Sequence, residues 1–189
     1  MRKKAAFIII NFIVILGLIL VFKSLSRDES ASRPPQFYPH RMLEAKVQEI
    51  AGRYSNGEVL VVSKKDHLLY FCRRGFIVRE DRWGGFVYRF PVPVSLGVNN
   101  RWTPEGEFKI YAKNPQSRYT LFLGFLGEYG LHGAETRLAS KLEQLERVNP
   151  DLTYVTRRDN TRGCVAVENR VIRYLYAQVD VNTPLYIMP

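Results

Sequence analysis

The sequence contains one cysteine and one histidine whose surroundings suit nucleophilic catalysis. Cys164 follows Arg162 and Gly163 and precedes a segment with helical spacing. A cysteine attacks as the thiolate, which a nearby cation or a helix N-terminus stabilises, and a glycine lets backbone amides approach a reacting carbonyl. His132, in the glycine-flanked sequence Tyr-Gly-Leu-His-Gly, is the candidate base. Residue types alone leave open that both are structural.

The other cysteine and histidines form no metal-ligand pattern. The chain has only Cys72 besides Cys164, and His40 and His67 besides His132. No C-x-x-C or H-x-x-x-H pair occurs, so we expect neither a metal nor another cofactor. Cys72 lies in an apolar segment, where a free cysteine behaves as a small buried hydrophobe. A Cys72–Cys164 disulfide remains an alternative in an oxidising compartment.

The N-terminus predicts a membrane anchor over residues 1–22. Residues 5–22 carry no charge, follow the basic residues 2–4 and would form a helix of about 27 Å, enough to cross a bilayer core of about 30 Å. The basic flank would keep the N-terminus in the cytoplasm and place the rest of the chain across the membrane. A cleaved signal peptide is the alternative, although no small-residue cleavage site follows the run.

The positive charge is concentrated before the main domain. Of the formal net charge of +10, residues 1–27 contribute five basic residues and no acidic one. The remaining excess is spread along the chain and suits an anionic cell-wall polymer or simply a solvated surface. No basic cluster interleaved with aromatic residues indicates nucleic acid as a partner.

After a polar linker over residues 23–40, the sequence predicts a mainly β domain with a few short helices. A helix is expected over 41–53, in a short segment that ends at 56, and the catalytic domain over 57–189. Many short strands between Gly, Pro and Asn turns indicate a sandwich or barrel. The expected strands are 58–63, 67–72, 76–79, 86–95, 107–112, 121–125 and 184–188, and two further helices are expected within 135–149 and 168–179.

Motifs around the candidate pair resemble those of the L,D-transpeptidase (YkuD-type) catalytic domain. The family signature is a His-Gly followed downstream by a Ser/Thr-x-Gly-Cys, matched here by His132-Gly133 and by residues 161–164. Similarity extends upstream through 58–71, 94–97 and the Thr-Pro-x-Gly-x-Phe-like stretch 102–108, and ends with a closing strand at 182–188. All landmarks occur in order, and the family fold is a β-sandwich with short helices.

The resemblance implies roles for the matched residues. Cys164 would be the nucleophile and His132 the general base, with the backbone at Gly133 orienting the imidazole. Backbone amides around Gly163 and Cys164 would hold the oxyanion. The residues expected to shape the acyl site are Thr161 and Arg162.

The implied substrate is the peptidoglycan stem peptide. Attack by the thiolate would expel the terminal D-alanine and leave a thioester, which an amine converts into a 3→3 cross-link and water into a trimmed stem. Carbapenems, which mimic the acyl donor, would then inhibit the enzyme. The domain would lie in the periplasm of a bacterium, on a single-pass inner-membrane anchor. An L,D-carboxypeptidase or cross-link hydrolase on the same fold, and a catalytically silent wall-binding domain, are the alternatives.

Two features depart from the family pattern. The separation of His132 and Cys164 is about twice the usual spacing, and the extra length holds a helical insertion at about 135–150. We expect either a lid beside the acceptor entrance or a surface helix. The second departure is Ala166, where many members have Arg or Asn. A polar contact to substrate would then come from Arg162 or Arg118, so Arg118, Tyr119 and Ala166 are named as candidate substrate-binding positions.

Overall fold

Valine-rich and aromatic strands build two main sheets in this protein. The structure is a computed structural model that describes residues 41–98, 101–149, 152–155 and 157–189. The predicted anchor over 1–22, the linker over 23–40 and His40 lie outside these residues. Within them, no helix has the length and apolarity needed to cross a membrane.

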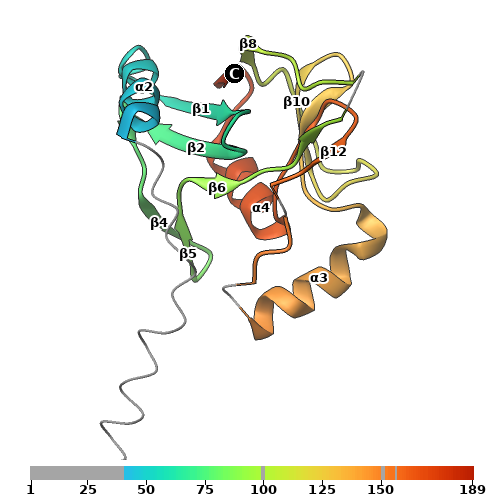
Figure 1. Cartoon of the computed structure of the whole chain (residues 1–189). Coiled ribbons are helices and arrows are strands. Elements are labelled where there is room, and N and C mark those ends of the chain that lie inside the picture. The colour runs from blue at the N-terminus through green and yellow to red at the C-terminus, as the bar shows by residue number, and fades with distance from the viewer. Residues whose placement is uncertain (1–40, 99–100, 150–151, 156) are drawn as a thin grey trace, which may run out of the picture. The chain divides into compact units, whose positions relative to one another are not determined.

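The larger sheet has the order β3-β2-β1-β14-β8, with β6 paired to β2. β1 and β14 are parallel, with Leu60 opposite Leu185, so the first strand of the domain lies beside its last. Figure 1 shows β1 and β2 side by side, and the strand order places β1 at the centre of this sheet. The strand bounds are β1 (Glu58–Ser63), β2 (Leu68–Arg73), β3 (Phe76–Ile77), β6 (Val92–Pro93), β8 (Gly106–Lys109) and β14 (Pro184–Met188).

The second sheet carries the candidate pair and has the order β13-β11-β10-β9. Its strands are β9 (Ala112–Asn114), β10 (Phe122–Leu126), β11 (Tyr129–His132) and β13 (Val165–Ala166). Two further strand pairs complete the β structure of the described residues. They are the hairpin of β4 (Glu80–Trp83) with β5 (Phe86–Arg89), and β7 (Leu96–Gly97) with β12 (Asp159–Thr161).

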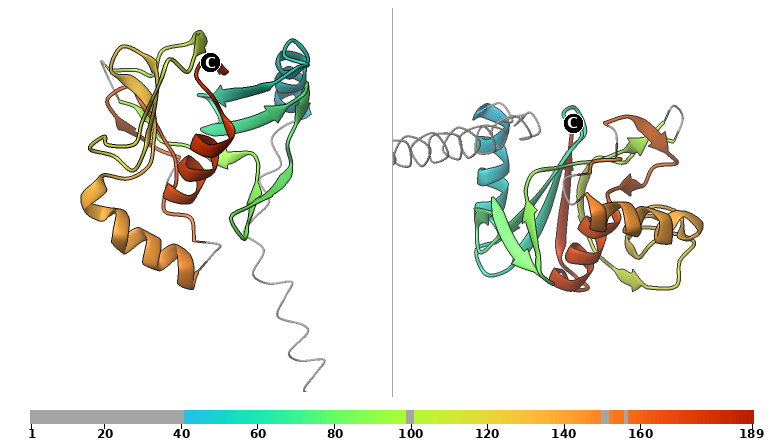
Figure 2. Two further views of the ribbon diagram at one scale, coloured as in Figure 1. Left: turned by 180° about the vertical axis from the view of Figure 1, so that it is seen from behind. Right: turned by 90° about the horizontal axis from the view of Figure 1, so that it is seen from below.

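Two helices cover these sheets, and Figure 2 shows their placement from two further sides. α2 (Arg41–Gly52) packs Val47, Ile50 and Ala51 against one face of β1 and β2. α4 (Asn169–Gln178) packs Ile172 and Leu175 into the main core, between the larger sheet and the second sheet. Each fully buried aliphatic side chain of this kind stabilises the fold by roughly 1.5–3 kcal/mol.

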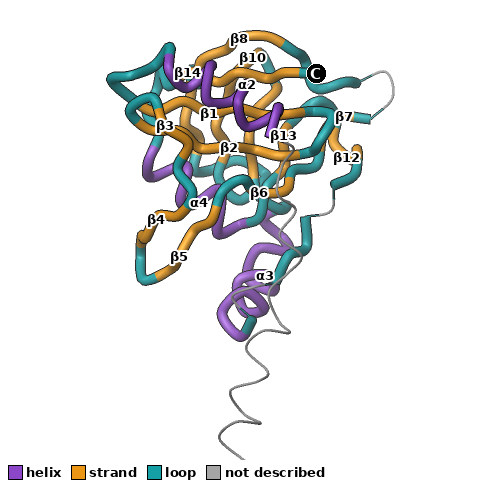
Figure 3. Tube along the Cα trace, turned by 60° about the vertical axis from the view of Figure 1, so that its left-hand side comes forward, coloured by secondary structure: helices purple, strands orange, loops and turns teal. Residues whose placement is uncertain are grey.

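The third helix, α3 (Thr136–Val148), is amphipathic but presents its apolar side largely to solvent. Leu138 and Leu145 are exposed and Val148 is 81% exposed, whereas Glu146 is only 6% exposed. Helical spacing identifies which face of a helix is apolar, but not whether another element covers it. In Figure 3, α3 projects beside α4, away from the sheets.

The predicted fold class, mainly β with short helices, is confirmed, and several strand predictions are corrected. The single strand expected over 86–95 is split into β5 and β6, because Pro91, which lies between them, has no amide hydrogen to donate to a ladder. The strand expected over 107–112 changes sheets. Ile110 N–H still donates to Thr183 O near the larger sheet, but Tyr111 N–H donates to Gly124 O in the second.

Candidate active site

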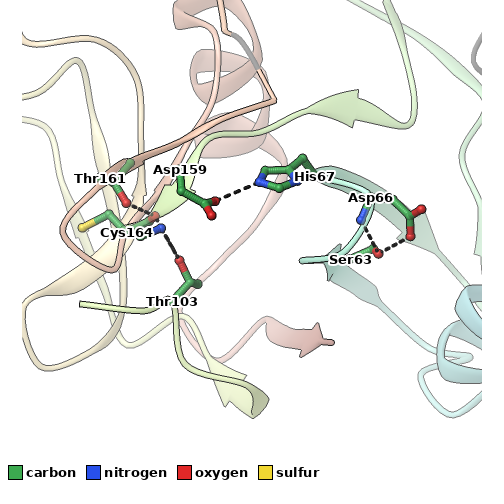
Figure 4. Close-up of polar contacts among 8 residues, drawn as sticks. Ser63, Asp66, His67, Thr103, Asp159, Thr161 and Cys164 are labelled. Atoms are coloured by element: carbon green, nitrogen blue, oxygen red, sulfur yellow. Dashed lines mark hydrogen bonds and ion pairs between the residues drawn. The ribbon is translucent and has the colours of Figure 1, made fainter. Parts of the chain in front are cut away.

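Cys164 lies in the turn between β12 and β13, and two threonine hydroxyls hold its carbonyl oxygen. Thr161 Oγ1 donates to Cys164 O over 2.7 Å, and Thr103 Oγ1 donates to the same atom over 3.5 Å. Thr103 Oγ1 also accepts the backbone N–H of Gly97 at 2.9 Å. Figure 4 shows the hydroxyls at the Cys164 peptide and the sulfur directed away from Thr103. The Cys164 backbone is therefore fixed while its thiol stays free of these contacts.

The residue before the cysteine must be glycine for two reasons. Gly163 has φ +99°, a left-handed conformation that side-chain-bearing residues rarely adopt. A Cβ at this position would also lie 2.5 Å from Cε1 of Tyr129. The turn thus brings the Gly163 backbone close against the Tyr129 ring.

A contact between a histidine and a carboxylate supports β12. His67 Nε2 lies 2.8 Å from Asp159 Oδ1, and Figure 4 shows this contact joining the β1–β2 turn to β12. The turn itself is closed by Ser63 Oγ, which donates to Asp66 Oδ2 over 2.6 Å. His67 therefore supports β12, the strand that precedes Cys164.

His132 ends β11 and is 5% exposed. Its Nδ1 lies 2.7 Å from Gly133 O. A carbonyl oxygen can only accept, so Nδ1 carries the proton and Nε2 holds the lone pair. Nε2 is buried and has no hydrogen-bond partner. An unpartnered buried acceptor of this kind suits a general base that waits for a proton.

Aromatic rings cover the imidazole. The Tyr119 ring stacks on His132 with centroids 3.7 Å apart and planes inclined by 15°. Phe122, the β10 partner of His132, lies nearly parallel at 6.4 Å. The Arg118 guanidinium lies over the Tyr119 ring, 4.8 Å from the ring centroid. His132 is thereby shielded from water by a ring that also contacts a cation.

Parallel pairing of β11 with β13 brings the two candidates together. Leu131 is opposite Val165 and His132 opposite Ala166, so the same register places Cys164 beside Gly130. Residues two apart share a face of a strand, so Cys164 is a diagonal cross-strand neighbour of His132. In this structure Cys164 Sγ–H donates to Glu128 O over 3.8 Å.

Burial shifts both groups toward their neutral forms. It lowers the pKa of His132, with a smaller contribution from the Arg118 charge and an opposing one from Gly133 O. Burial also raises the pKa of Cys164, opposed by the Gly130 backbone N–H and by Arg118. The resting pair is therefore a neutral thiol beside a neutral imidazole. Arg118 is the cation that favours the Cys164 thiolate.

Cys164 opens into a cavity of about 830 Å³. This volume lies within the range of sites for small ligands. Three arginines and one carboxylate line it, which favours a ligand with negative charge. The charged lining residues are Arg101, Arg118, Arg162 and Glu128, and the aromatic ones are Tyr119, Phe122 and Tyr129.

A second cavity of about 550 Å³ lies behind the segment that carries Tyr119. Ser117 and Tyr119 line both cavities. The insertion helix contributes Thr136 and Ala139 to the second cavity, while the residues that line the Cys164 cavity include none from α3. The helix expected to be either a lid or a surface helix thus borders the second cavity.

The structure brings most of the named site residues together. Cys164, Arg162, Arg118 and Tyr119 line one cavity, and His132 lies beneath Tyr119. The backbone positions also take part: Gly133 O accepts from His132, Gly163 forms the turn, and the Thr161 hydroxyl holds Cys164 O. Ala166 instead forms a backbone bridge with Ser95, outside the cavity lining.

Sequence reasoning assigned no role to Thr103, Arg101 or Glu128. Thr103 lies in the Thr-Pro-x-Gly-x-Phe-like stretch, and that motif could have identified it as a site residue. Arg101 and Glu128 lie in loops that carry no such pattern.

The cysteines are separate, and the described residues offer no metal site. Cys72 and Cys164 are both free thiols, so the disulfide alternative is wrong. Cys72 belongs to the cluster beneath α2, where burial raises its pKa to about 12. Among the residues that the structure describes, no three His, Cys, Asp or Glu side chains gather where they could hold a metal ion.

Solved structures share this fold at low sequence identity. An L,D-transpeptidase from Mycobacterium tuberculosis H37Rv matches with a TM-score of 0.51 and 17% identity, over 70% of this chain and 58% of that one. One from Mycobacterium smegmatis gives 0.50 and 16% over 70% and 58%. L,D-transpeptidase 3 from Mycobacterium tuberculosis, with a faropenem-derived adduct, gives 0.51 and 14% over 70% and 60%. The match thus spans about three fifths of each relative.

The family assignment rests on the sequence of the domain itself. No protein with a curated description matches the chain significantly. The family model of the L,D-transpeptidase catalytic domain, YkuD, matches residues 57–187, which include both sheets, His132 and Cys164. The chain therefore belongs to the YkuD family of L,D-transpeptidase catalytic domains.

Proposed function

We propose that this protein is an L,D-transpeptidase that joins peptidoglycan stem peptides through a thioester on Cys164. The observation that supports this most is that Cys164, at a cavity lined by arginines, is a diagonal cross-strand neighbour of His132, whose Nε2 has no hydrogen-bond partner. A nucleophile, a base with a free lone pair and cationic groups for an anionic substrate are the parts that acyl transfer needs.

In the first half-reaction the thiol proton moves from Cys164 Sγ to His132 Nε2 as sulfur attacks the carbonyl between the diamino acid and the terminal D-alanine. The Sγ–C bond forms, and the C–N bond breaks after His132 returns the proton to the leaving amine. The thiol now contacts Glu128 O, so attack requires its rotation toward Nε2. A neutral thiol and a neutral imidazole suit this mechanism, because the thiol proton moves to the imidazole while the sulfur attacks.

In the second half-reaction an amine of another stem attacks the thioester. Its nitrogen forms the new amide bond, the C–S bond breaks, and His132 carries the amine proton to the departing sulfur. Backbone amides around Gly163 and Cys164 are the proposed oxyanion donors in both steps. The fixed Cys164 carbonyl supports this role, because the two threonine hydroxyls limit movement of the turn.

The arginines are the proposed carboxylate-binding groups. A stem peptide carries a terminal D-alanine carboxylate, and guanidinium groups bind carboxylates through paired hydrogen bonds. Arg118 and Arg162 lie in the same cavity as Cys164 and replace the polar side chain that Ala166 lacks. The predicted N-terminal anchor would hold this site at the outer face of a bacterial inner membrane.

A hydrolytic role on the same fold is the second candidate. The first half-reaction is common to transpeptidase and carboxypeptidase, and the two differ only in whether amine or water attacks the thioester. Incubation with a disaccharide-tetrapeptide separates them. A dimeric muropeptide indicates transfer, and a shortened monomer indicates hydrolysis.

The test of the nucleophile is intact-mass measurement of the detergent-solubilised full chain after incubation with a carbapenem. We expect one adduct of the drug's mass in the wild type and in Cys72→Ala, and none in Cys164→Ala. An adduct that persists in Cys164→Ala would refute the assignment. Absence of any adduct and of any muropeptide product would favour the silent wall-binding alternative.

A further inference from the structure

The insertion between His132 and Cys164 attaches to α4 through buried polar groups. Glu146 is the one buried side chain of α3. Its Oε1 accepts the hydroxyl of Tyr154 at 2.8 Å and the backbone N–H of Arg170 at 3.2 Å. Arg170 Nη2 also donates to Leu152 O over 3.3 Å. Figure 1 shows α3 beside α4, consistent with these contacts.

These contacts satisfy the start of α4. The residue that precedes the helix, Glu168, makes no side-chain cap. The first amides of a helix have no partner within it and require one from elsewhere. Here Asn169 N–H donates to the Tyr154 hydroxyl at 2.5 Å and Arg170 N–H to Glu146. The insertion helix and the segment that follows it therefore supply the cap that α4 lacks.

Asn169 connects the start of α4 to the candidate active site. Its Oδ1 accepts the backbone N–H of Ala134 at 2.8 Å. That N–H and the Gly133 carbonyl belong to one planar peptide group, and the carbonyl accepts His132 Nδ1–H at 2.7 Å. A Cβ at Gly133 would lie 2.5 Å from Asn169 Oδ1, so the contact is close. One peptide thus links Asn169 to the imidazole.

We propose that Glu146 and Tyr154 are positioning residues for His132. They fix the first turn of α4, Asn169 fixes the 133–134 peptide, and that peptide holds the proton of His132 on Nδ1. The inference rests on the proposed function only in that His132 serves as the base. The insertion thus helps to determine which nitrogen of the His132 imidazole carries the proton.

Support from a hydrogen-bonded outer group is a general way to fix the tautomer of a functional histidine. A merely structural cap would stabilise α4 without changing the imidazole. The two roles differ in one observable, the position of the His132 proton, which can be read without substrate.

The experiment is a long-range ¹H–¹⁵N spectrum of the detergent-solubilised full chain with labelled histidine, near neutral pH. The chain has three histidines, and His132→Gln identifies the signal of interest. We expect the wild type to hold a single Nδ1-protonated form. Glu146→Ala and Tyr154→Phe should populate the Nε2-protonated form and lower carbapenem acylation by about fivefold to tenfold, mainly in the rate of reaction and less in binding.

Two variants serve as controls. Glu146→Gln keeps the acceptor oxygen and should retain the wild-type spectrum. Glu143→Gln removes the ion pair between α3 and Arg173 of α4 without touching the path to His132, and should do the same. If Glu146→Ala does not fold, Tyr154→Phe decides.

An unchanged tautomer and acylation rate in folded Tyr154→Phe would overturn the inference. A changed tautomer in a protein whose wild type forms no thioester would instead retain the inference and refute the proposed function.

Discussion

The ring of Tyr119 lies flat on the imidazole of His132, with 3.7 Å between centroids. The same tyrosine lines the cavity into which Cys164 opens. Tyr119 therefore forms both a wall of the candidate substrate site and the cover that keeps water from the imidazole. Its removal should change the proton affinity of His132 as well as substrate contact.

Tyr119→Ala should raise the pKa of His132 toward its ordinary value, because burial is the main cause of the lowered pKa. Acylation requires the unprotonated imidazole, so the acidic limb of the rate profile should move to higher pH. Tyr119→Phe keeps the stacked ring and should keep the wild-type limb. The measurement is the rate of carbapenem acylation between about pH 4 and pH 8. An acidic limb that does not move in Tyr119→Ala would refute this account of the shift.

Arg118→Gln should make Cys164 less reactive toward alkylation. The Arg118 charge opposes the burial that raises the Cys164 pKa, so its loss should raise that pKa further. At pH 8.5 the thiolate fraction, and with it the iodoacetamide rate, should fall by about twofold to fivefold. Arg118→Lys keeps the charge and is the matched control. Equal rates in both variants would indicate that the charge has no effect on the thiol.

The candidate pair, Cys164 and His132, could be selected from the sequence because each residue lies in a short motif. Gly163 packs closely against Tyr129 and Gly133 against Asn169, so neither position has room for a side chain. Each glycine stands next to its candidate residue in the sequence, so a short motif contains both. The long valine-rich strand β1 was also predictable, because its length is sufficient for a clear signal. These features depend on residues close together in the chain.

Other features depend on contacts between distant segments. β13 has only two residues and exists because β11 and Ser95 pair with it on either side. No pattern in so short a segment can predict a strand. Glu146 belongs to a helix whose leucines define the apolar face, and its burial follows from the N–H and O–H groups that it accepts near the start of α4. Such placements require the tertiary structure.

The two threonines that bind Cys164 O should differ in what they contribute. Thr103→Val would leave the buried Gly97 N–H without an acceptor, at a cost of about 1–3 kcal/mol, whereas Thr161→Val removes one hydrogen bond worth about 0.5–1.5 kcal/mol. We expect a lower melting temperature for Thr103→Val, by about 2–8 °C. Thr103→Ser retains the hydroxyl and should melt close to the wild type. A larger loss in Thr161→Val would reverse the assignment.

The two cysteines should be distinguishable by a thiol count. Burial raises the pKa of Cys72 to about 12, and the side chain lies wholly within the cluster beneath α2. At pH 8 only about one Cys72 in ten thousand would be ionised even if reagent reached it. Cys164 opens into a cavity, so iodoacetamide should modify one thiol in the native protein and two in denaturant. Cys164→Ala should reduce these counts to none and one. Native labelling that survives in Cys164→Ala would mean that the β2 strand opens to solvent, and would contradict the packing of α2 against it.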